Sequence, residues 1–168
     1  MAGLEAYLRA RRAEGHKLLL PYLTAGYPVG EWPRLIEGFA LAGADGMEIG
    51  LPFSDPVMDG PTIQEASTLA LEAGANPQAL LDEVAKMEAG IPLVAMTYYN
   101  ICFRMGHERF ASALVQAGIS GCILPDLPLE ELGPWAEAAD AFNNLGNLQR
   151  GDGELQAALA SFERALAL

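Results

Sequence analysis

The stretch Gly46-Met-Glu-Ile-Gly-Leu-Pro-Phe-Ser-Asp-Pro56 joins a short apolar run to a proline-rich loop. Side chains alternate between the two faces of a strand, so Met47 and Ile49 share one face and Glu48 lies on the other. Loops at the carboxyl ends of parallel strands are common ligand-binding segments. The stretch therefore predicts a strand over 46–51 with one acidic side chain on its far face, followed by a candidate ligand loop.

The alternation of strands and helices continues on both sides of this stretch. Further strands are predicted at 17–24, 92–99 and 121–125, and helices at 32–43, 61–73, 77–89 and 106–117. Strands alternating with helices of this length form right-handed βαβ units with a parallel sheet. A complete (β/α)8 barrel needs about 250 residues. The sequence thus predicts an α/β fold, a partial TIM (β/α)8-type barrel of about four βα units.

The sequence pattern changes after Trp135, where no further strand is predicted. Two stretches rich in Ala and Leu follow, separated by Gly151-Asp-Gly153. We expect a domain boundary near 138, with a half-barrel over 1–138 and a helical hairpin over 139–168.

Composition excludes several classes of function. Acidic residues number 22 and basic residues 10, for a net charge of −12, which argues against a nucleic-acid partner. Apolar runs are interrupted by Gly or Pro before they reach the ~18 residues of a membrane span. Cys102 and Cys122 stand in no redox or zinc motif, and with two histidines in the chain we expect no metal site. The cysteines are expected to be reduced thiols in a cytoplasmic protein.

Glu48 is the strongest candidate for acid–base chemistry. It lies between glycines on the strand face opposite the apolar side chains. An ionisable group inside a barrel is costly unless it is paired or used, and burial of a carboxyl group raises its pKa toward the range useful for proton transfer. The alternative is a salt-bridged or water-bound carboxylate at the rim of the sheet.

The surroundings of Glu48 also allow two interpretations. In the following loop, Asp55 or Asp59 could contact a ligand, or could cap the helix that begins near Pro61. Residue parity places further side chains on the face of Glu48: Tyr22, Met96, Tyr98 and Ile123. They would form a wall for a flat apolar substrate, or simply fill the barrel.

Six segments occur in the order and at the spacing of a known family: Pro21-Tyr-Leu-Thr-Ala-Gly26, Ala44-Asp-Gly-Met-Glu-Ile-Gly50, Pro52-Phe-Ser-Asp-Pro56, Asp59-Gly-Pro61, Met96-Thr-Tyr-Tyr-Asn100 and Leu124-Pro-Asp-Leu-Pro128. Through them, residues 1 to about 137 resemble the first half of tryptophan synthase alpha subunits. The resemblance implies aldol cleavage of indole-3-glycerol phosphate to indole and glyceraldehyde 3-phosphate, in tryptophan biosynthesis, without a metal or organic cofactor.

The resemblance also implies roles for single residues. Glu48 matches the family's acid–base glutamate, and Asp59 matches the aspartate that hydrogen-bonds the indole N–H. The residues at positions that line the indole pocket are Tyr22, Met96, Tyr98, Ile123 and Pro125. The residues at positions that meet the beta subunit are Pro52, Phe53, Ser54, Asp55, Pro56, Asn100 and Phe103.

The chain departs from the family after its fourth unit. Nothing between 130 and 168 resembles the Gly-rich turns that hold the substrate phosphate, so we expect impaired lyase activity from these residues alone. The first and fourth strands would each have an open edge, and such edges favour association into a homo-oligomer.

The carboxyl-terminal residues resemble a single tetratricopeptide (TPR) repeat at Phe142, Leu145, Gly146, Gly153, Ala158, Phe162 and Ala165. The alternative is a generic amphipathic hairpin. The combination of two half-signatures suggests a recombined, designed or mis-joined chain. Its alternative function is a non-catalytic interaction protein that uses the hairpin and the open sheet edges.

Overall fold

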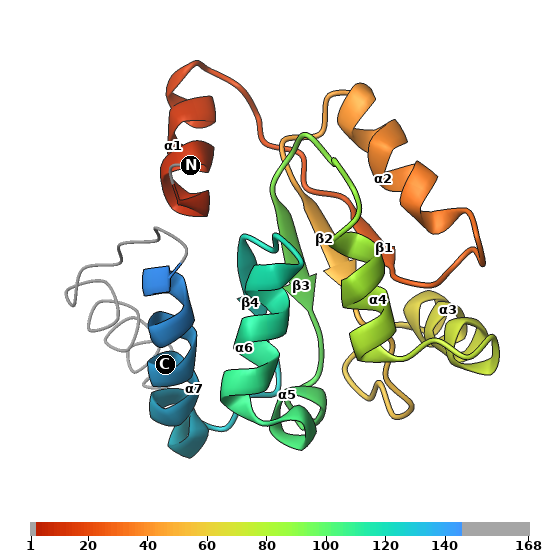
Figure 1. The fold of residues 1–168 in the computed structure, drawn as a ribbon. Helices are drawn as coiled ribbons and strands as arrows, with labels where there is room; N and C mark the ends of the chain where they lie inside the picture. The colour runs from red at the N-terminus through yellow and green to blue at the C-terminus, as the bar shows by residue number, and fades with distance from the viewer. Residues whose placement is uncertain (1–2, 146–168) are drawn as a thin grey trace, which may run out of the picture.

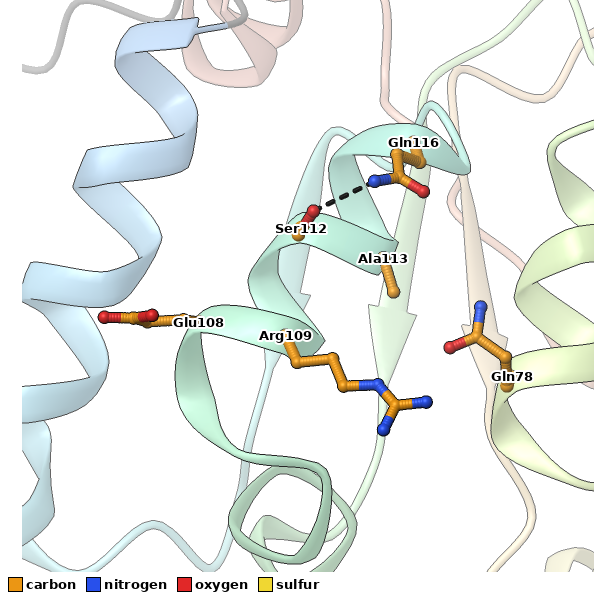
Figure 2. Close-up of a pocket in the computed structure, with 6 residues that line it drawn as sticks. All are labelled: Gln78, Glu108, Arg109, Ser112, Ala113 and Gln116. Carbon is orange, nitrogen blue, oxygen red and sulfur yellow. Dashed lines mark hydrogen bonds between the residues drawn. The ribbon is translucent and has the colours of Figure 1, made fainter.

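The computed structural model describes residues 3–145 (Figure 1). These residues form four strands, β1 (Tyr22–Thr24), β2 (Met47–Gly50), β3 (Leu93–Met96) and β4 (Gly121–Ile123). They also form seven helices, α1 (Leu4–Ala13), α2 (Trp32–Leu41), α3 (Pro61–Glu72), α4 (Pro77–Val84), α5 (Tyr99–Met105), α6 (His107–Gln116) and α7 (Leu129–Leu145).

The strands form one parallel sheet in the sequential order β1-β2-β3-β4. Doubly wound sheets reverse their strand order at a switch point, whereas a barrel adds each new strand on the same side as the last. The sequential order confirms the predicted α/β fold and the partial barrel.

One face of the sheet carries the hydrophobic core. Met47 and Ile49 are 0% and 1% exposed, and they pack in one cluster with Ile36 of α2, Leu81 of α4 and Phe110 of α6. Figure 1 shows α4 and α6 in front of the sheet, with α2 to one side. The predicted orientation of the apolar side chains of β2 is confirmed, and it turns Glu48 to the opposite face.

Strand register places the side chains of the opposite face in two layers. Tyr22 pairs with Glu48, and Glu48 pairs with Val94. One layer further toward the carboxyl ends, Met96 pairs with Ile123. Helix α1 covers part of this face, because a Cβ atom on Gly121 would lie 3.1 Å from Leu4 Cδ2.

An ion pair ties α1 to the start of β2. Arg11 Nε donates to Asp45 Oδ1 at 2.9 Å, and the Leu19 N–H donates to Asp45 Oδ2 at 3.0 Å. The Leu19 hydrogen bond and the Arg11 guanidinium lower the pKa of Asp45 below its usual value. Because the lowered pKa belongs to the folded state, the ionised form stabilises the fold above the unfolded pKa of about 3.9, and this stabilisation is lost as the pH falls through the folded pKa.

Asp45→Asn is therefore expected to lower the thermal midpoint at pH 7 by several degrees. The difference from the unsubstituted chain should shrink as the pH falls toward 3, because the Asp45 carboxylate is then being protonated. Thermal denaturation of both chains between pH 3 and pH 7 measures this. A difference that stays constant over that range would show that the charge of Asp45 is unimportant.

Several elements differ from the sequence-based predictions. Helix α1 and helix α5 were not predicted, and β1 and β3 are shorter than the predicted strands 17–24 and 92–99. Tyr98 in particular lies after β3, at the residue that precedes α5.

Helix α7 continues through residue 138, where the domain boundary is predicted. The predicted hairpin lies mostly outside the described residues, which end at 145. No helix within residues 3–145 is long and apolar enough to cross a membrane.

Candidate active site

A small pocket opens at the carboxyl ends of the strands. It is lined by Tyr22, Leu51, Phe53, Asp59, Ser67, Met96, Thr97, Tyr98 and Pro125. Loops that follow β2, β3 and β4 meet here, as expected for a parallel sheet of this type. Five of the seven residues predicted to be catalytic or to line the indole pocket do line it: Tyr22, Asp59, Met96, Tyr98 and Pro125. Phe53, which is predicted to face a partner, lines it as well.

The other two predicted residues of this site, Glu48 and Ile123, lie next to the pocket lining. Glu48 is one layer deeper in the sheet than Met96, beside Tyr22. Ile123 pairs with Met96 on the edge strand β4 and is 36% exposed. The structure therefore brings the predicted acid, the pocket and the apolar wall to one end of one sheet face.

Glu48 is half-buried, with no ion pair or side-chain hydrogen bond to any other residue in the described range. The salt-bridge alternative is therefore wrong for residues 3–145. A half-buried carboxylate at the inner face of a sheet remains able to exchange a proton with a bound ligand.

Asp59 is held by Tyr98. The Tyr98 hydroxyl donates to Asp59 Oδ2 at 3.1 Å and accepts from the Met58 N–H at 2.9 Å. The predicted capping alternative is wrong, because α3 begins after Gly60 and no side chain caps it. The Asp59 side chain instead belongs to the pocket.

Tyr22 lies near both predicted catalytic carboxylates, Glu48 and Asp59. Burial raises the pKa of the Tyr22 phenol, the hydrogen bond from Thr24 lowers it, and the nearby Asp59 and Glu48 carboxylates raise it further. Glu48 is the cross-strand partner of Tyr22, and Asp59 lines the same pocket as Tyr22. The two predicted catalytic carboxylates thus both lie near Tyr22.

Gly50 makes room for that ring. A Cβ atom at Gly50 would overlap the hydroxyl and the ring carbon Cζ of Tyr22. Gly50→Ala is expected to displace the Tyr22 ring and to cost about 1–3 kcal/mol of stability. In the double variant with Tyr22→Ala, most of that added cost should disappear, because the overlap is gone. Denaturant unfolding of the unsubstituted chain, the two single variants and the double variant measures this. If the free-energy losses of the two single variants simply add up in the double variant, the overlap is contradicted.

The predicted partner-facing residues have different exposures. Pro52 is buried, and the Phe53 ring stacks on Tyr98 with centroids 5.0 Å apart. Asn100 is exposed, and Phe103 is 60% exposed. The remaining three belong to the loop after β2, with Ser54 and Asp55 exposed and Pro56 half-buried.

Sequence reasoning missed Leu51, Ser67 and Thr97 as pocket residues. It also missed a polar cluster that joins α5, α6 and α7. The Tyr99 hydroxyl donates to Glu131 Oε2 at 2.8 Å and lies 2.7 Å from His107 Nε2. Since the hydroxyl has one proton and gives it to the carboxylate, Nε2 of His107 must carry the donor hydrogen. No spacing in the sequence indicates this contact.

The model of the tryptophan synthase alpha chain family matches residues 8–145. The chain belongs to this family. The match includes every predicted catalytic, pocket and partner-facing residue, and it extends seven residues beyond the predicted boundary at 138.

Curated tryptophan synthase alpha chains share close to half of their residues with this chain in the aligned region. The alpha chain of Nitratidesulfovibrio vulgaris is 46% identical over 134 residues, which are 76% of this chain and 51% of that protein. The alpha chain of Halobacterium salinarum is 46% identical over 128 residues, 73% of this chain and 46% of that protein. The chain thus spans about half the length of the curated relatives that it matches.

Solved structures of the family have the same fold. Tryptophan synthase subunit alpha from Legionella pneumophila superposes with a TM-score of 0.79 at 34% identity, covering 84% of this chain and 56% of that chain. Tryptophan synthase from M. tuberculosis gives a TM-score of 0.78 at 36% identity, covering 84% and 58%. The four parallel strands described above are therefore a part of the tryptophan synthase alpha fold.

Proposed function

We propose that this site performs the acid–base steps in the aldol cleavage of indole-3-glycerol phosphate to indole and glyceraldehyde 3-phosphate. The observation that carries the proposal is the pair of carboxylates around Tyr22. Glu48 is half-buried without a partner in the described residues, and Asp59 is oriented at the pocket by Tyr98. The match to the alpha chain family supports the same reaction.

In the proposed mechanism, Glu48 serves first as the general acid and then as the general base. It transfers its proton to the ring carbon that carries the glycerol side chain, and Asp59 accepts a hydrogen bond from the ring N–H as positive charge develops there. The Glu48 carboxylate then removes the proton of the side-chain hydroxyl. The carbon–carbon bond breaks, its electron pair returns to the ring, and the hydroxyl-bearing carbon becomes the aldehyde. No metal or organic cofactor is needed for these steps.

Asp59→Asn is expected to weaken the binding of indole by about tenfold, because the carboxylate's charge-assisted hydrogen bond to the ring N–H is worth at least ~1.5 kcal/mol. NMR titration of the chain with indole measures the affinity and shows whether resonances of Tyr22 and Tyr98 shift. Glu65→Gln, on the exposed surface of α3, is the matched control. Equal indole affinity for Asp59→Asn and the unsubstituted chain would exclude this role of Asp59.

A polypeptide of these 168 residues alone is proposed to be a poor lyase. The substrate phosphate would have no Gly-rich turn to hold it, and the binding energy of that group would not be available to position the reacting carbon. We expect this because the chain aligns with only about half the length of each relative.

A second candidate function is that of an interaction protein. Within the described residues, β1 and β4 each pair on one side only, which leaves two sheet edges open. Helix α2, which follows β1, exposes Leu35, Phe39 and Leu41 at 38%, 37% and 91%. These features favour association, either with a second copy of the chain or with a partner such as a tryptophan synthase beta subunit at the loop after β2 and at α5. A separate TPR-like hairpin over 139–168 stays part of this proposal.

A further inference from the structure

Two polar side chains anchor the loop after β2, and they hold different parts of Asp59. Gln64 Nε2 donates to the backbone carbonyl of Asp59 at 2.9 Å and contacts that of Pro56 at 3.3 Å. Tyr98 instead binds the Asp59 carboxylate, at 3.1 Å. Gln64 therefore fixes the backbone of the loop, and Tyr98 fixes the direction of the Asp59 side chain.

Tyr98 is itself well fixed. It is 5% exposed, its ring stacks on Phe53, and its hydroxyl accepts the Met58 N–H at 2.9 Å. Burial raises the pKa of Tyr98, so the hydroxyl keeps its proton at neutral pH and donates it to Asp59. The tip of the same loop is open to solvent, with Val57 83% exposed. Among residues 3–145 the Tyr98 phenol is the one side chain that hydrogen-bonds the Asp59 carboxylate, so its loss would free the carboxylate to rotate.

The Tyr98 hydrogen bond engages one carboxylate oxygen of Asp59, Oδ2. Oδ1 has no hydrogen-bond partner in the part of the chain that the structure describes, and an ionised carboxylate can accept several hydrogen bonds. Asp59 and Tyr98 line the same pocket together with Met96, so a flat aromatic ring held there would present its edge to Asp59.

We propose that the Tyr98 hydroxyl is a positioning group that orients Asp59, so that the pocket selects aromatic rings carrying an N–H donor over rings of the same shape without one. The inference rests on the proposed function for the identity of the ring, an indole. It adds that the preference for rings with an N–H donor depends on Tyr98 as well as on Asp59.

The test compares indole with indene, which has the same bicyclic shape and no N–H. The dissociation constants of both are measured by NMR titration for the full chain, for Tyr98→Phe and for Asp59→Asn. Tyr98→Phe keeps the ring that stacks on Phe53 and removes only the hydroxyl. We expect a preference for indole of about tenfold in the unsubstituted chain, which falls at least about threefold in Tyr98→Phe while the affinity for indene is unchanged.

Amide hydrogen exchange gives a second readout that does not depend on a ligand. In Tyr98→Phe the Met58 amide should exchange at least about tenfold faster, because it loses its acceptor. The Leu51 amide, which donates to the Met96 carbonyl at 2.9 Å, should be unaffected and reports that the fold is intact. Tyr27→Phe is the matched control, since it removes a tyrosine hydroxyl that does not line the pocket.

The outcomes separate the inference from the proposed function. If Asp59→Asn abolishes the indole preference and Tyr98→Phe retains it, the positioning role is overturned and the role of Asp59 stands. If Asp59→Asn leaves the preference unchanged, or the unsubstituted chain shows none, the proposed role of Asp59 fails and the inference fails with it. Unchanged exchange at Met58 in Tyr98→Phe would also overturn the inference.

Discussion

Replacing Glu48 by glutamine is expected to lower the release of indole from indole-3-glycerol phosphate by about 10²–10⁴-fold. The effect is best measured in a hybrid in which residues 1–137 are joined to the carboxyl-terminal half of the Nitratidesulfovibrio vulgaris alpha chain, which is 46% identical to this chain over the aligned residues. The hybrid supplies a full-length barrel, so the effect of Glu48 is not hidden by weak substrate binding.

The expected loss follows from the proton transfers. Glutamine keeps the size and the hydrogen-bonding ability of Glu48, but it cannot give a proton to the ring carbon or take one from the hydroxyl. Both steps would then rely on water, which is a much weaker acid and base. Because Glu48 has no ion pair within residues 3–145, the substitution breaks no described contact and the fold should be retained.

Glu65→Gln in the same hybrid controls for the loss of a negative charge, since Glu65 is exposed on α3. Its rate should stay within about twofold of the parent hybrid. A Glu48→Gln hybrid that keeps most of its activity would contradict the proposed acid–base role.

Phe110→Ala is expected to destabilise the chain by about 3–5 kcal/mol. Phe110 is 0% exposed on α6, belongs to the core cluster with Met47 and Ile49, and lies 5.8 Å from the ring of Trp135 on α7. Its removal would leave a cavity at the point where the sheet, α6 and α7 meet. Native domains are stable by about 5–15 kcal/mol, so this single change would remove a large part of the total.

Urea unfolding measures the effect, with Phe103→Ala as the matched control. Phe103 is 60% exposed on α5, so its truncation should cost at most about 1 kcal/mol. Equal losses for the two phenylalanines would mean that α6 does not pack on the sheet as described.

The sequence predicted which face of the sheet holds the candidate catalytic residues. Along β2, apolar and acidic side chains alternate in step with the two faces of a strand. Met47 and Ile49 are apolar and are stabilised by burial against the helices. Because strand side chains alternate, Glu48 is then on the opposite face of the sheet. Parity also placed Tyr22 and Met96 correctly. These predictions depend on local geometry alone, which a single sequence contains.

The arrangement around Asp59 could not be predicted in the same way. The sequence pattern predicts a strand over 92–99, but β3 ends at Met96 and Tyr98 lies in the turn before α5. Its bond to Asp59 joins residues 39 positions apart, and no spacing rule specifies such a contact. Helix α5 was missed because its residues Tyr99-Asn-Ile-Cys-Phe-Arg-Met105 carry no initiating Pro or capping side chain.

Helix α1 was missed for a different reason. Its sequence is polar overall, and none of its residues is buried. Its attachment depends instead on the Arg11–Asp45 ion pair, between residues 34 positions apart, and on the contact of Leu4 with Gly121. Tertiary contacts of this kind decide the position of a polar helix.

Residues 1–137 are proposed to supply a working amino-terminal half of a tryptophan synthase alpha barrel. The most direct measurement is the rate of indole release from indole-3-glycerol phosphate by the purified hybrid with the Nitratidesulfovibrio vulgaris carboxyl-terminal half. We predict a rate within about tenfold of the parent relative, a difference of at most ~1.4 kcal/mol in the barrier. A hybrid that folds cooperatively and releases no indole would contradict the claim.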